Sequence, residues 1–165
     1  MSTTHFSLIA QDRVVYEDDV TLVNLPGSAG VIGVMPKHAP LMAVLQPGEI
    51  LVRKAGEPDH FFAVGGGFAE VRPDEVVVLA RSAESVDEID MARAEEALRR
   101  AQAYLASPEK ERDMERQLAM EAALRRSLAR MKVARRHASI RSRSAGKSPR
   151  QQQKQEEQAA SDQTE

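Results

Sequence analysis

The hydrophobic pattern of this chain changes its period once, near residue 85, and that change limits the folds open to it. Before this point, short segments rich in β-branched and aromatic residues alternate apolar with polar positions and are separated by Gly and Pro. After it, apolar residues recur at three- and four-residue steps through an alanine-rich segment. We therefore expect an all-β domain followed by helices. The segments expected to form strands are 5–10, 13–20, 20–25, 49–54, 60–64, 67–72 and 75–80.

The spacing of these segments is typical of a β-sandwich or barrel. Three consecutive glycines, Gly65, Gly66 and Gly67, stand between two of the expected strands. A phosphate-binding loop is one interpretation of such a triplet, but it requires a helix to follow, and the sequence that follows is strand-like. The pattern favours a bulge or a tight turn, in which glycine accepts a positive φ or lets another backbone approach closely.

Two helices are expected after the sandwich. Ser85 and Glu88 have the spacing of a capping box, and "SPEK" at 107–110 provides a serine N-cap and a proline at the first helical position. Because the link between the helices is short, they should form an antiparallel hairpin. Alanines dominate both apolar stripes, so the hairpin should be loosely attached. The stripes consist of Ile89, Ala94, Leu98, Ala101 and Leu105 in the first helix and of Met120, Leu124, Leu128 and Met131 in the second.

The sequence after His137 contains one large apolar residue, Ile140, and is rich in Gln, Ser and charge, which predicts a disordered tail. The predicted fold class is thus an all-β N-terminal sandwich followed by an α-helical antiparallel hairpin and a disordered C-terminal tail. The expected boundaries are 1–86 for the sandwich, 87–137 for the hairpin and 138–165 for the tail.

The balance of acidic and basic residues changes near the same point of the chain. Residues 1–88 hold 6 Lys and Arg against 13 Asp and Glu, whereas residues 89–137 hold 12 against 8. The basic start of the tail allows an alternative function, a basic-tailed nucleic-acid or anion-binding module. No aromatic residue is interleaved there to stack on bases, and the acidic front opposes phosphate attraction, so a solvated tail is the preferred interpretation.

Reactive groups are sparse. The chain has no cysteine, and its four histidines stand apart, so we expect neither a metal site nor a thiol nucleophile. No acid, base and nucleophile converge in the pattern, which disfavours an enzyme acting alone. No apolar run approaches the roughly 20 residues of a transmembrane helix. The N-terminus lacks a signal-peptide pattern, so we expect a protein that begins in the cytosol.

Residues 27–50 contain Gly27, Gly30 and Gly33 at three-residue spacing, followed by "HAPL" and "PGEI". Together with "GGGFAEV" and "EIDMARA" further on, this order of motifs resembles the epsilon subunit of bacterial F-type ATP synthases over about 130 residues. A lone glycine motif would be weak evidence, whereas an ordered series is specific.

The resemblance implies a non-catalytic central-stalk subunit that couples rotation of the gamma subunit to the c-subunit ring. It implies that one sandwich face binds gamma and that loops at one end rest on the c-ring. By this analogy Ser28, Val31, Lys37 and His38 are candidates for the c-ring surface. Relatives often carry an acidic residue at position 31 and many carry Gly at 37, so no specific salt bridge is transferred. A pH sensor or general base at His38 is the alternative to a surface or packing histidine, which is preferred.

The resemblance also implies regulation by the hairpin. In this family the motif "IDMARA" serves ATP binding when the hairpin is folded down. No cofactor is required, and Mg-ATP is a candidate regulatory ligand. The alternative is that these arginines are solvated or paired and that the motif serves helix packing. The nucleotide-binding candidates are Glu84 on the adenine side, Ile89, Asp90 and Arg93 in the motif, and Arg126 and Arg130 on the phosphate side.

The implied mechanism has two hairpin states. The compact state permits rotation, and the extended state reaches the alpha and beta catalytic subunits and inhibits ATP hydrolysis. The implied partners are gamma, the c-ring and alpha/beta, with no nucleic acid. Membrane association is indirect, through the complex, at the cytoplasmic face of the bacterial inner membrane.

Overall fold

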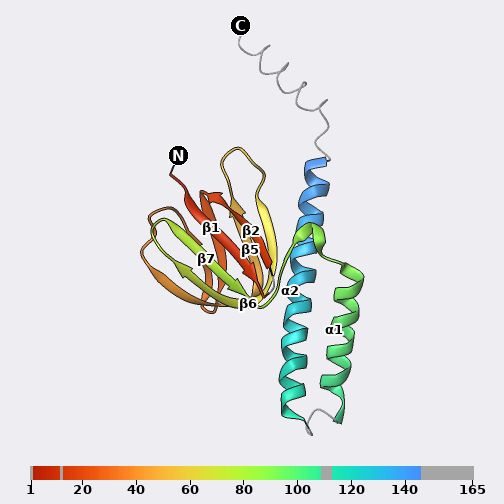
Figure 1. Ribbon diagram of the computed structural model, residues 1–165. Helices are drawn as coiled ribbons and strands as arrows, with labels where there is room; N and C mark the ends of the chain where they lie inside the picture. The colour runs from red at the N-terminus through yellow and green to blue at the C-terminus, as the bar shows by residue number, and fades with distance from the viewer. Residues whose placement is uncertain (1, 12, 109–112, 146–165) are drawn as a thin grey trace, which may run out of the picture. The chain divides into compact units, whose positions relative to one another are not determined.

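The computed structural model describes residues 2–11, 13–108 and 113–145 (Figure 1). Met1–Ala134 forms one compact unit, which contains the sheet, the first helix and most of the second, and the second unit begins at Arg135. The strands are β1 (Thr4–Ala10), β2 (Arg13–Val20), β3 (Leu22–Gly27), β4 (Gly30–Val34), β5 (Leu41–Arg53), β6 (His60–Val71), β7 (Glu75–Ala80) and β8 (Ala83–Ser85).

All eight strands belong to one sheet, in the order β2-β1-β7-β6-β5-β3-β4, with β8 pairing with β6. Two long strands, β5 and β6, connect its layers. The first half of β5 pairs with the second half of β6, which also pairs with β7. The second half of β5 pairs with β3 and with the first half of β6, whose other neighbour is β8. The predicted sandwich is confirmed.

The glycine triplet lies inside β6 instead of separating two strands. Leu45 pairs with Gly67 and Pro47 pairs with Gly65, so the strand runs through the triplet. Gly66 and Gly67 have φ values of 84° and 153°, as the prediction of positive φ required. A Cβ at Gly67 would lie 2.1 Å from the carbonyl oxygen of Leu79. The glycines therefore bend a continuous strand where the neighbouring backbone comes close, and no turn forms.

Strand β4, the first half of β5 and β8 were not expected. Glycines and prolines punctuate residues 27–50, and these residues usually weaken a strand pattern. Here Gly27 and Gly30 close the β3–β4 hairpin, while Pro47 lies within β5. Gly and Pro thus occur inside strands of this domain as well as at strand ends.

The core lies between the layers and consists of sandwich residues alone. Alternate positions along each strand supply it, as expected for strands with one face buried. Its largest fully buried side chains are Phe6, Leu8, Leu25 and Ile50, with Val20, Val23, Val34, Val52, Val64, Val71, Val76 and Val78.

A short 3-10 turn, η1 (Val86–Glu88), leads into two antiparallel helices, α1 (Met91–Ala106) and α2 (Met114–Ala145). The Ser85 and Glu88 capping box is present, but it caps η1. Helix α1 is capped by Asp90, which accepts a hydrogen bond of 3.0 Å from the Arg93 N–H.

The second helix differs from the expectation in three ways. Ser107 ends α1, since its N–H and hydroxyl both donate to the Tyr104 carbonyl, while the Asp113 side chain caps α2. Leu128, expected in the apolar stripe, is 47% exposed. Helix α2 continues to Ala145, into the segment expected as tail, because alanine and arginine are good helix formers there. The remainder of the expected tail, 146–165, lies outside the described residues.

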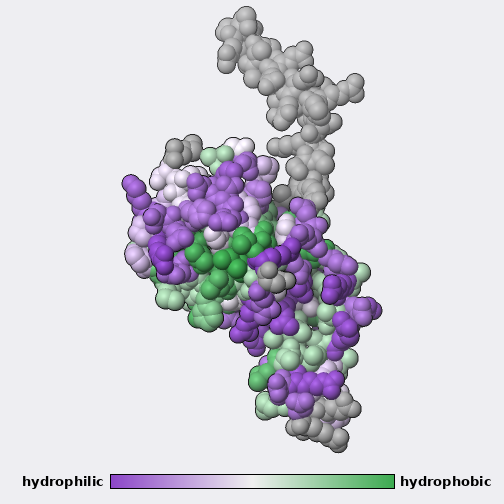
Figure 2. All heavy atoms as spheres, in the orientation of Figure 1, coloured by the Kyte–Doolittle hydropathy of each residue, from purple (hydrophilic) through white to green (hydrophobic). Residues whose placement is uncertain are grey.

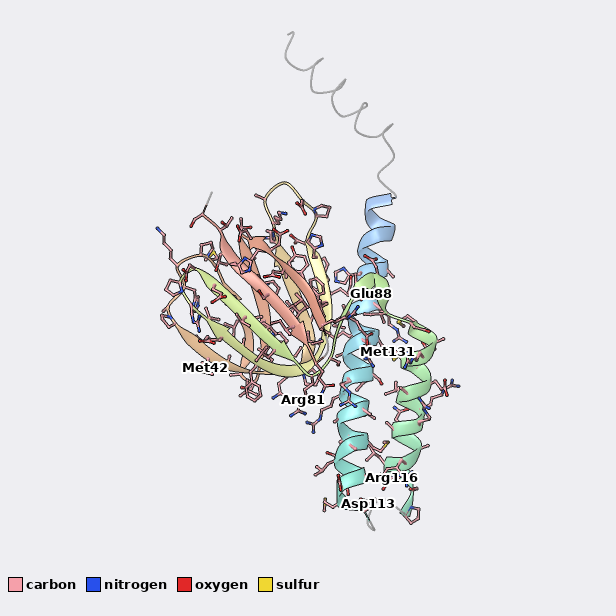
Figure 3. The ribbon with its side chains drawn as sticks, viewed as in Figure 1. Met42, Arg81, Glu88, Asp113, Arg116 and Met131 are labelled. Atoms are coloured by element: carbon pink, nitrogen blue, oxygen red, sulfur yellow. The ribbon has the colours of Figure 1, made fainter. Side chains whose placement is uncertain are left out.

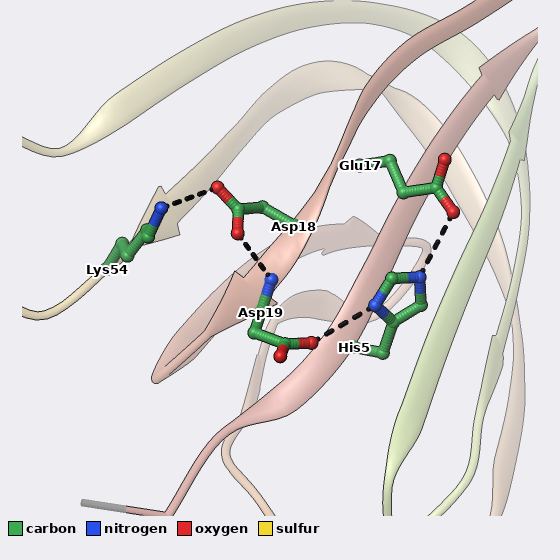
Figure 4. Close-up of polar contacts among 5 residues, drawn as sticks. All are labelled: His5, Glu17, Asp18, Asp19 and Lys54. Carbon is green, nitrogen blue, oxygen red and sulfur yellow. Dashed lines mark hydrogen bonds and ion pairs between the residues drawn. The ribbon is translucent and has the colours of Figure 1, made fainter.

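A charged network joins β1, β2 and the end of β5 (Figure 4). The His5 ring lies 3.1 Å from a carboxylate oxygen of Asp19 and 3.1 Å from one of Glu17. These hydrogen bonds raise the pKa of His5, with Asp19 the larger cause. Lys54 donates to Asp18 at 2.7 Å, which lowers the pKa of that carboxyl group.

Candidate functional site

A polar pocket forms where β8, η1 and α1 meet helix α2. It is a cavity of about 190 Å³, lined by Glu84, Glu88, Asp90, Arg93 and Arg130, with Ala94. Four of the six predicted nucleotide-binding residues therefore lie around one cavity, although Arg130 is 46 residues from Glu84 in sequence. Ile89, the first of the two residues between η1 and α1, does not line it.

Local structure explains the motif "IDMARA". The Asp90 side chain caps α1, and the Ala94 N–H donates to the Asp90 carbonyl at 3.0 Å. Ala94 is 3% exposed, so a larger side chain would not fit there. Asp90 and Ala94 therefore already have structural roles, and the Arg93 side chain is the part of the motif left available to a ligand.

Arg130 donates a hydrogen bond to Glu84 and forms an ion pair with it. The two side chains are 28% and 30% exposed, so water screens the pair only in part. This contact joins the last strand of the sandwich to helix α2. We call it the Glu84–Arg130 pair.

A second ion pair lies at the same junction. Arg13 of β2 reaches Glu88 at 3.4 Å, and Glu88, which is labelled in Figure 3, also accepts from the Ser85 N–H at 3.3 Å. The pocket thus holds three carboxylates and two guanidinium groups. A polyanion would be repelled by the carboxylates and would have to compete with Glu84 for Arg130.

Arg126, the second predicted phosphate-side arginine, lies at a different cavity. That cavity, of about 160 Å³, is lined by the glycines 65–67, Arg81, Arg125 and Arg126 together with Gln46 and apolar residues. The stem of Arg126 passes over Gly65, where a Cβ would lie 3.0 Å from Cδ. The structure brings Glu84, Asp90, Arg93 and Arg130 together and places Arg126 elsewhere.

The four predicted c-ring residues lie near the two ends of β4, three of them on its flanking connections and Val31 within the strand. Ser28 and Val31 border the β3–β4 turn, and Val31 is 75% exposed. Lys37 and His38 follow β4, where the Lys37 N–H donates to the Pro73 carbonyl at 2.7 Å. His38 Nδ1 donates to the Ala39 carbonyl at 2.7 Å.

Lys37 has a φ of 66°, which is unfavourable for a residue with a Cβ. Glycine would adopt this conformation without that penalty.

The structure reveals an apolar surface that sequence reasoning missed. Val14 pairs with Ile9, Ile9 with Leu79, Leu79 with Phe68, and Phe68 with Val44, so these side chains form one row across five strands. We call it the apolar row. Phe68 is 57% exposed and Leu79 55%. Figure 2 shows apolar surface gathered on this part of the sandwich. Runs such as "VVVLA", apolar at consecutive positions, were the available signal.

Within the described part of the chain, no three His, Cys, Asp or Glu side chains are arranged to hold a metal ion. Among the helices the structure describes, none has the length and apolar character needed to span a bilayer.

Comparison with known proteins matches the two parts of the chain to two family models. Residues 3–86 match the ATP synthase delta/epsilon chain β-sandwich domain, and residues 87–135 match the delta/epsilon chain long α-helix domain. The ATP synthase epsilon chain of Chloroflexus aggregans is 42% identical over 133 residues, covering 81% of this chain and 93% of the relative. That of Dehalococcoides mccartyi is 45% identical over 136 residues, covering 81% and 94%.

Comparison with solved structures leads to the same family. The chain matches one from the Euglena gracilis mitochondrial ATP synthase, OSCP/F1/c-ring in rotational state 1, with a TM-score of 0.65 and 26% identity, covering 76% of this chain and 77% of that one. A sandwich and helical hairpin in this order define a non-catalytic subunit of the ATP synthase central stalk. The chain belongs to the ATP synthase delta/epsilon family, and its curated relatives are epsilon chains.

Proposed function

We propose that this stalk subunit transmits rotation between the gamma subunit and the c-ring through its sandwich, and that its hairpin is a releasable inhibitor of ATP hydrolysis. The observation that carries the proposal is the attachment of the hairpin. The sandwich core contains no helix residue, and the junction contains the polar Glu84–Arg130 pair. A domain held in this way is able to detach without disrupting the core of its neighbour.

The hairpin buries mostly small side chains. Among the hairpin residues that the structure describes, the buried apolar ones are Ala94, Ala101, Ala129, Met131 and Val133. Three of these five are alanines, so little apolar area stabilises the compact state. Small differences in binding energy then suffice to shift the equilibrium between compact and extended hairpins.

The apolar row supports a gamma-binding face on the sandwich. Antiparallel sheets usually leave a polar face to water, whereas here both faces of several strands are apolar. An exposed apolar patch of this kind marks a protein interface. The c-ring contact would then use the β3–β4 connection with the start of β4 and the β4–β5 connection, which carry Ser28, Val31, Lys37 and His38. With these contacts, the subunit would be held by its partners at the cytoplasmic face of the bacterial inner membrane.

ATP is proposed as a ligand of the polar pocket. Arg93 and Arg130 supply guanidinium groups for phosphates, and Glu84 would contact the adenine once Arg130 has exchanged partners. Asp90 would act indirectly, by fixing the start of α1 and so the position of Arg93. Mg²⁺ would arrive with the phosphates, since this ion usually takes a substrate's phosphates together with waters as ligands.

One hydrolysis experiment tests the inhibitory role. The enzyme is assembled with the full chain or with a chain lacking residues 89–165, and ATP hydrolysis is compared at matched occupancy. The proposal predicts faster hydrolysis with the shortened chain, which retains the whole sandwich core. Equal rates would contradict inhibition by this hairpin and leave the rotor role intact.

The nucleotide role needs a separate titration. Calorimetry with Mg-ATP is run on the full chain, on Arg130→Ala and on Arg126→Ala. We expect Arg130→Ala to weaken ATP binding strongly and Arg126→Ala to weaken it less. Of these two arginines, only Arg130 lines the polar pocket. Absence of ATP binding to the parent chain would refute the nucleotide role.

The gamma face is tested by a charge placed on the apolar row. Phe68→Lys should weaken binding of gamma, because it would bury an unpaired charge in the interface. Leu118→Lys is the matched control, since Leu118 is 59% exposed on α2, away from the row. Equal affinities of the two variants would exclude the row as the gamma face.

A further inference from the structure

Strand β5 has an open edge in its first half. Among the described residues, positions 41–44 pair with β6 alone, whereas the second half of β5 pairs with both β6 and β3. Pairing of Gly27 with Leu45 closes this edge at one end. A stretch of roughly 13 Å, at 3.4 Å per residue, therefore has no second neighbouring strand.

The hydrogen bonds of β6 show which backbone groups face the open edge. The Arg72 N–H, just after β6, donates to the Glu75 carbonyl of β7 at 2.7 Å. Because the bonding direction alternates along a strand, the even-numbered residues in this half of β6 bond toward β7 and the odd-numbered ones toward β5, where Ala43 is one partner. Met42 therefore directs its N–H and carbonyl away from β6, and Val44 directs its N–H the same way.

The sequence protects the two outer strands of the sheet but not this edge. Natural sheets protect their edges with charged side chains, prolines or very short strands. Strand β4 is five residues long. Residues 41–44, "LMAV", contain no charge and no proline, and the Met42 and Val44 side chains are 77% and 52% exposed. Such an edge is a template for a strand from another chain. Strand β2, in contrast, carries Arg13, Glu17, Asp18 and Asp19.

A groove of about 340 Å³ borders the open edge. Residues 42–44 of β5 form one side of it, and residues 28–32 of the β3–β4 hairpin form the other. Ile32, which packs against the sandwich core, lies in the groove together with Ala43. Because Ala43 is small, the groove leaves room for an apolar side chain from an added strand.

The position of the groove indicates its occupant. Val44 is the last residue of the apolar row, and Met42 lies on the same face of β5, two residues away. A partner that covers the apolar row therefore reaches the open edge directly. This continuity favours the partner of the apolar row, the gamma subunit.

We propose that residues 41–44 of β5 bind a short extended segment of the gamma subunit as an added β-strand, with apolar side chains on both of its faces. The inference rests on the proposed gamma face and specifies how gamma attaches there. In strand addition the backbone hydrogen bonds supply affinity, and pockets for alternate side chains supply specificity. Backbone hydrogen bonds also require one register, whereas an apolar face alone permits sliding, so this joint suits a subunit that transmits rotation.

The test is residue-by-residue amide hydrogen exchange of the full chain, alone and bound to purified gamma. In the free chain we expect the Met42 and Val44 amides to exchange at least tenfold faster than that of Ala43, which is bonded to β6. Binding of gamma should slow Met42 and Val44 at least tenfold more than it slows Ala43. Equal slowing of all three amides would indicate general stabilisation of the sandwich and would overturn strand addition.

Two substitutions at one position separate the backbone from the side chain. Val44→Pro removes the outward N–H and breaks no bond to β6, whereas Val44→Ala shortens the side chain and keeps the N–H. We expect Val44→Pro to weaken gamma binding at least tenfold and Val44→Ala less than threefold. Equal weakening would overturn strand addition. The denaturant midpoint of each free variant is measured as well, and if Val44→Pro does not fold, the exchange experiment on the parent chain decides.

Other occupants give different exchange patterns. Slowing of Met42 and Val44 in the free chain at higher protein concentration would assign the edge to a second copy of this chain. Slowing only after addition of the c-ring would assign it to that ring. Either result overturns the assignment to gamma.

Failure of the gamma face itself is distinguishable. If Phe68→Lys weakens gamma binding while Met42 and Val44 still exchange rapidly in the parent complex, the face is supported and strand addition is refuted. Absence of gamma binding to the parent chain would refute both.

Discussion

Removing the Glu84–Arg130 pair should release the hairpin by a measurable amount. The pair is about 70% buried on both sides, 30% and 28% exposed, so it is worth about 1 kcal/mol, the upper part of the range for partly exposed ion pairs. That energy corresponds to a roughly fivefold change in the ratio of compact to released hairpins. Salt near 1 M should reduce the difference, because the screening length falls to about 3 Å.

The assay is a double-mutant cycle of Glu84→Gln, Arg130→Gln and both together. Because the chain has no cysteine, one introduced cysteine on the sandwich and one on α2 can carry a fluorescence-transfer pair. The denaturant midpoint for loss of transfer measures hairpin release. Asp59→Asn is the control, since it breaks the Arg53 pair within the sandwich. A coupling energy near zero for Glu84 and Arg130 would refute the argument that this contact holds the hairpin.

Three further predictions concern the sandwich. Lys37→Gly should raise the free energy of unfolding by about 0.5–1 kcal/mol, because glycine tolerates a φ of 66°, and a shifted denaturant midpoint would show it. Gly67→Ala should destabilise by about 3 kcal/mol or more, because its Cβ would overlap the Leu79 carbonyl oxygen, whereas Gly56→Ala, with φ 79° but open space, should lose only about 1 kcal/mol; equal losses would contradict the overlap argument. The raised pKa of His5 means that its two carboxylate contacts stabilise the fold fully below pH 6.5 and less as pH rises through the folded pKa, so His5→Gln should flatten that slope in unfolding curves recorded from pH 5 to 9.

The order of the two domains was predictable from the sequence because it depends only on the spacing of apolar residues along the chain. Alternation over residues 5–80 and helical spacing after residue 89 are local signals, and the structure follows both. The path of β6 was not predictable, because a glycine triplet in isolation fits a turn. It bends a strand here because Leu79 passes so close to Gly67, a contact between segments that no local pattern encodes.

Some features of the candidate site were also predictable from the sequence, and others were not. The spacing of Asp90 and Arg93 followed from a motif, and helix capping explains that spacing physically. Arg126 and Arg130 are four residues apart on one helix, yet their side chains reach different cavities, because Glu84 attracts one and Gly65 admits the other. The apolar row required the register of five strands, which no single segment specifies.

The most direct test of a releasable inhibitory hairpin is the ATP hydrolysis rate of the assembled enzyme carrying Glu84→Ala, compared in the full chain and in the chain lacking residues 89–165. In the full chain the substitution frees the hairpin to extend, so the account predicts slower hydrolysis than with the parent chain. In the shortened chain the same substitution should have no effect, because no hairpin remains to be released. Hydrolysis unchanged by Glu84→Ala in the full chain, or slowed equally in both, would contradict the account.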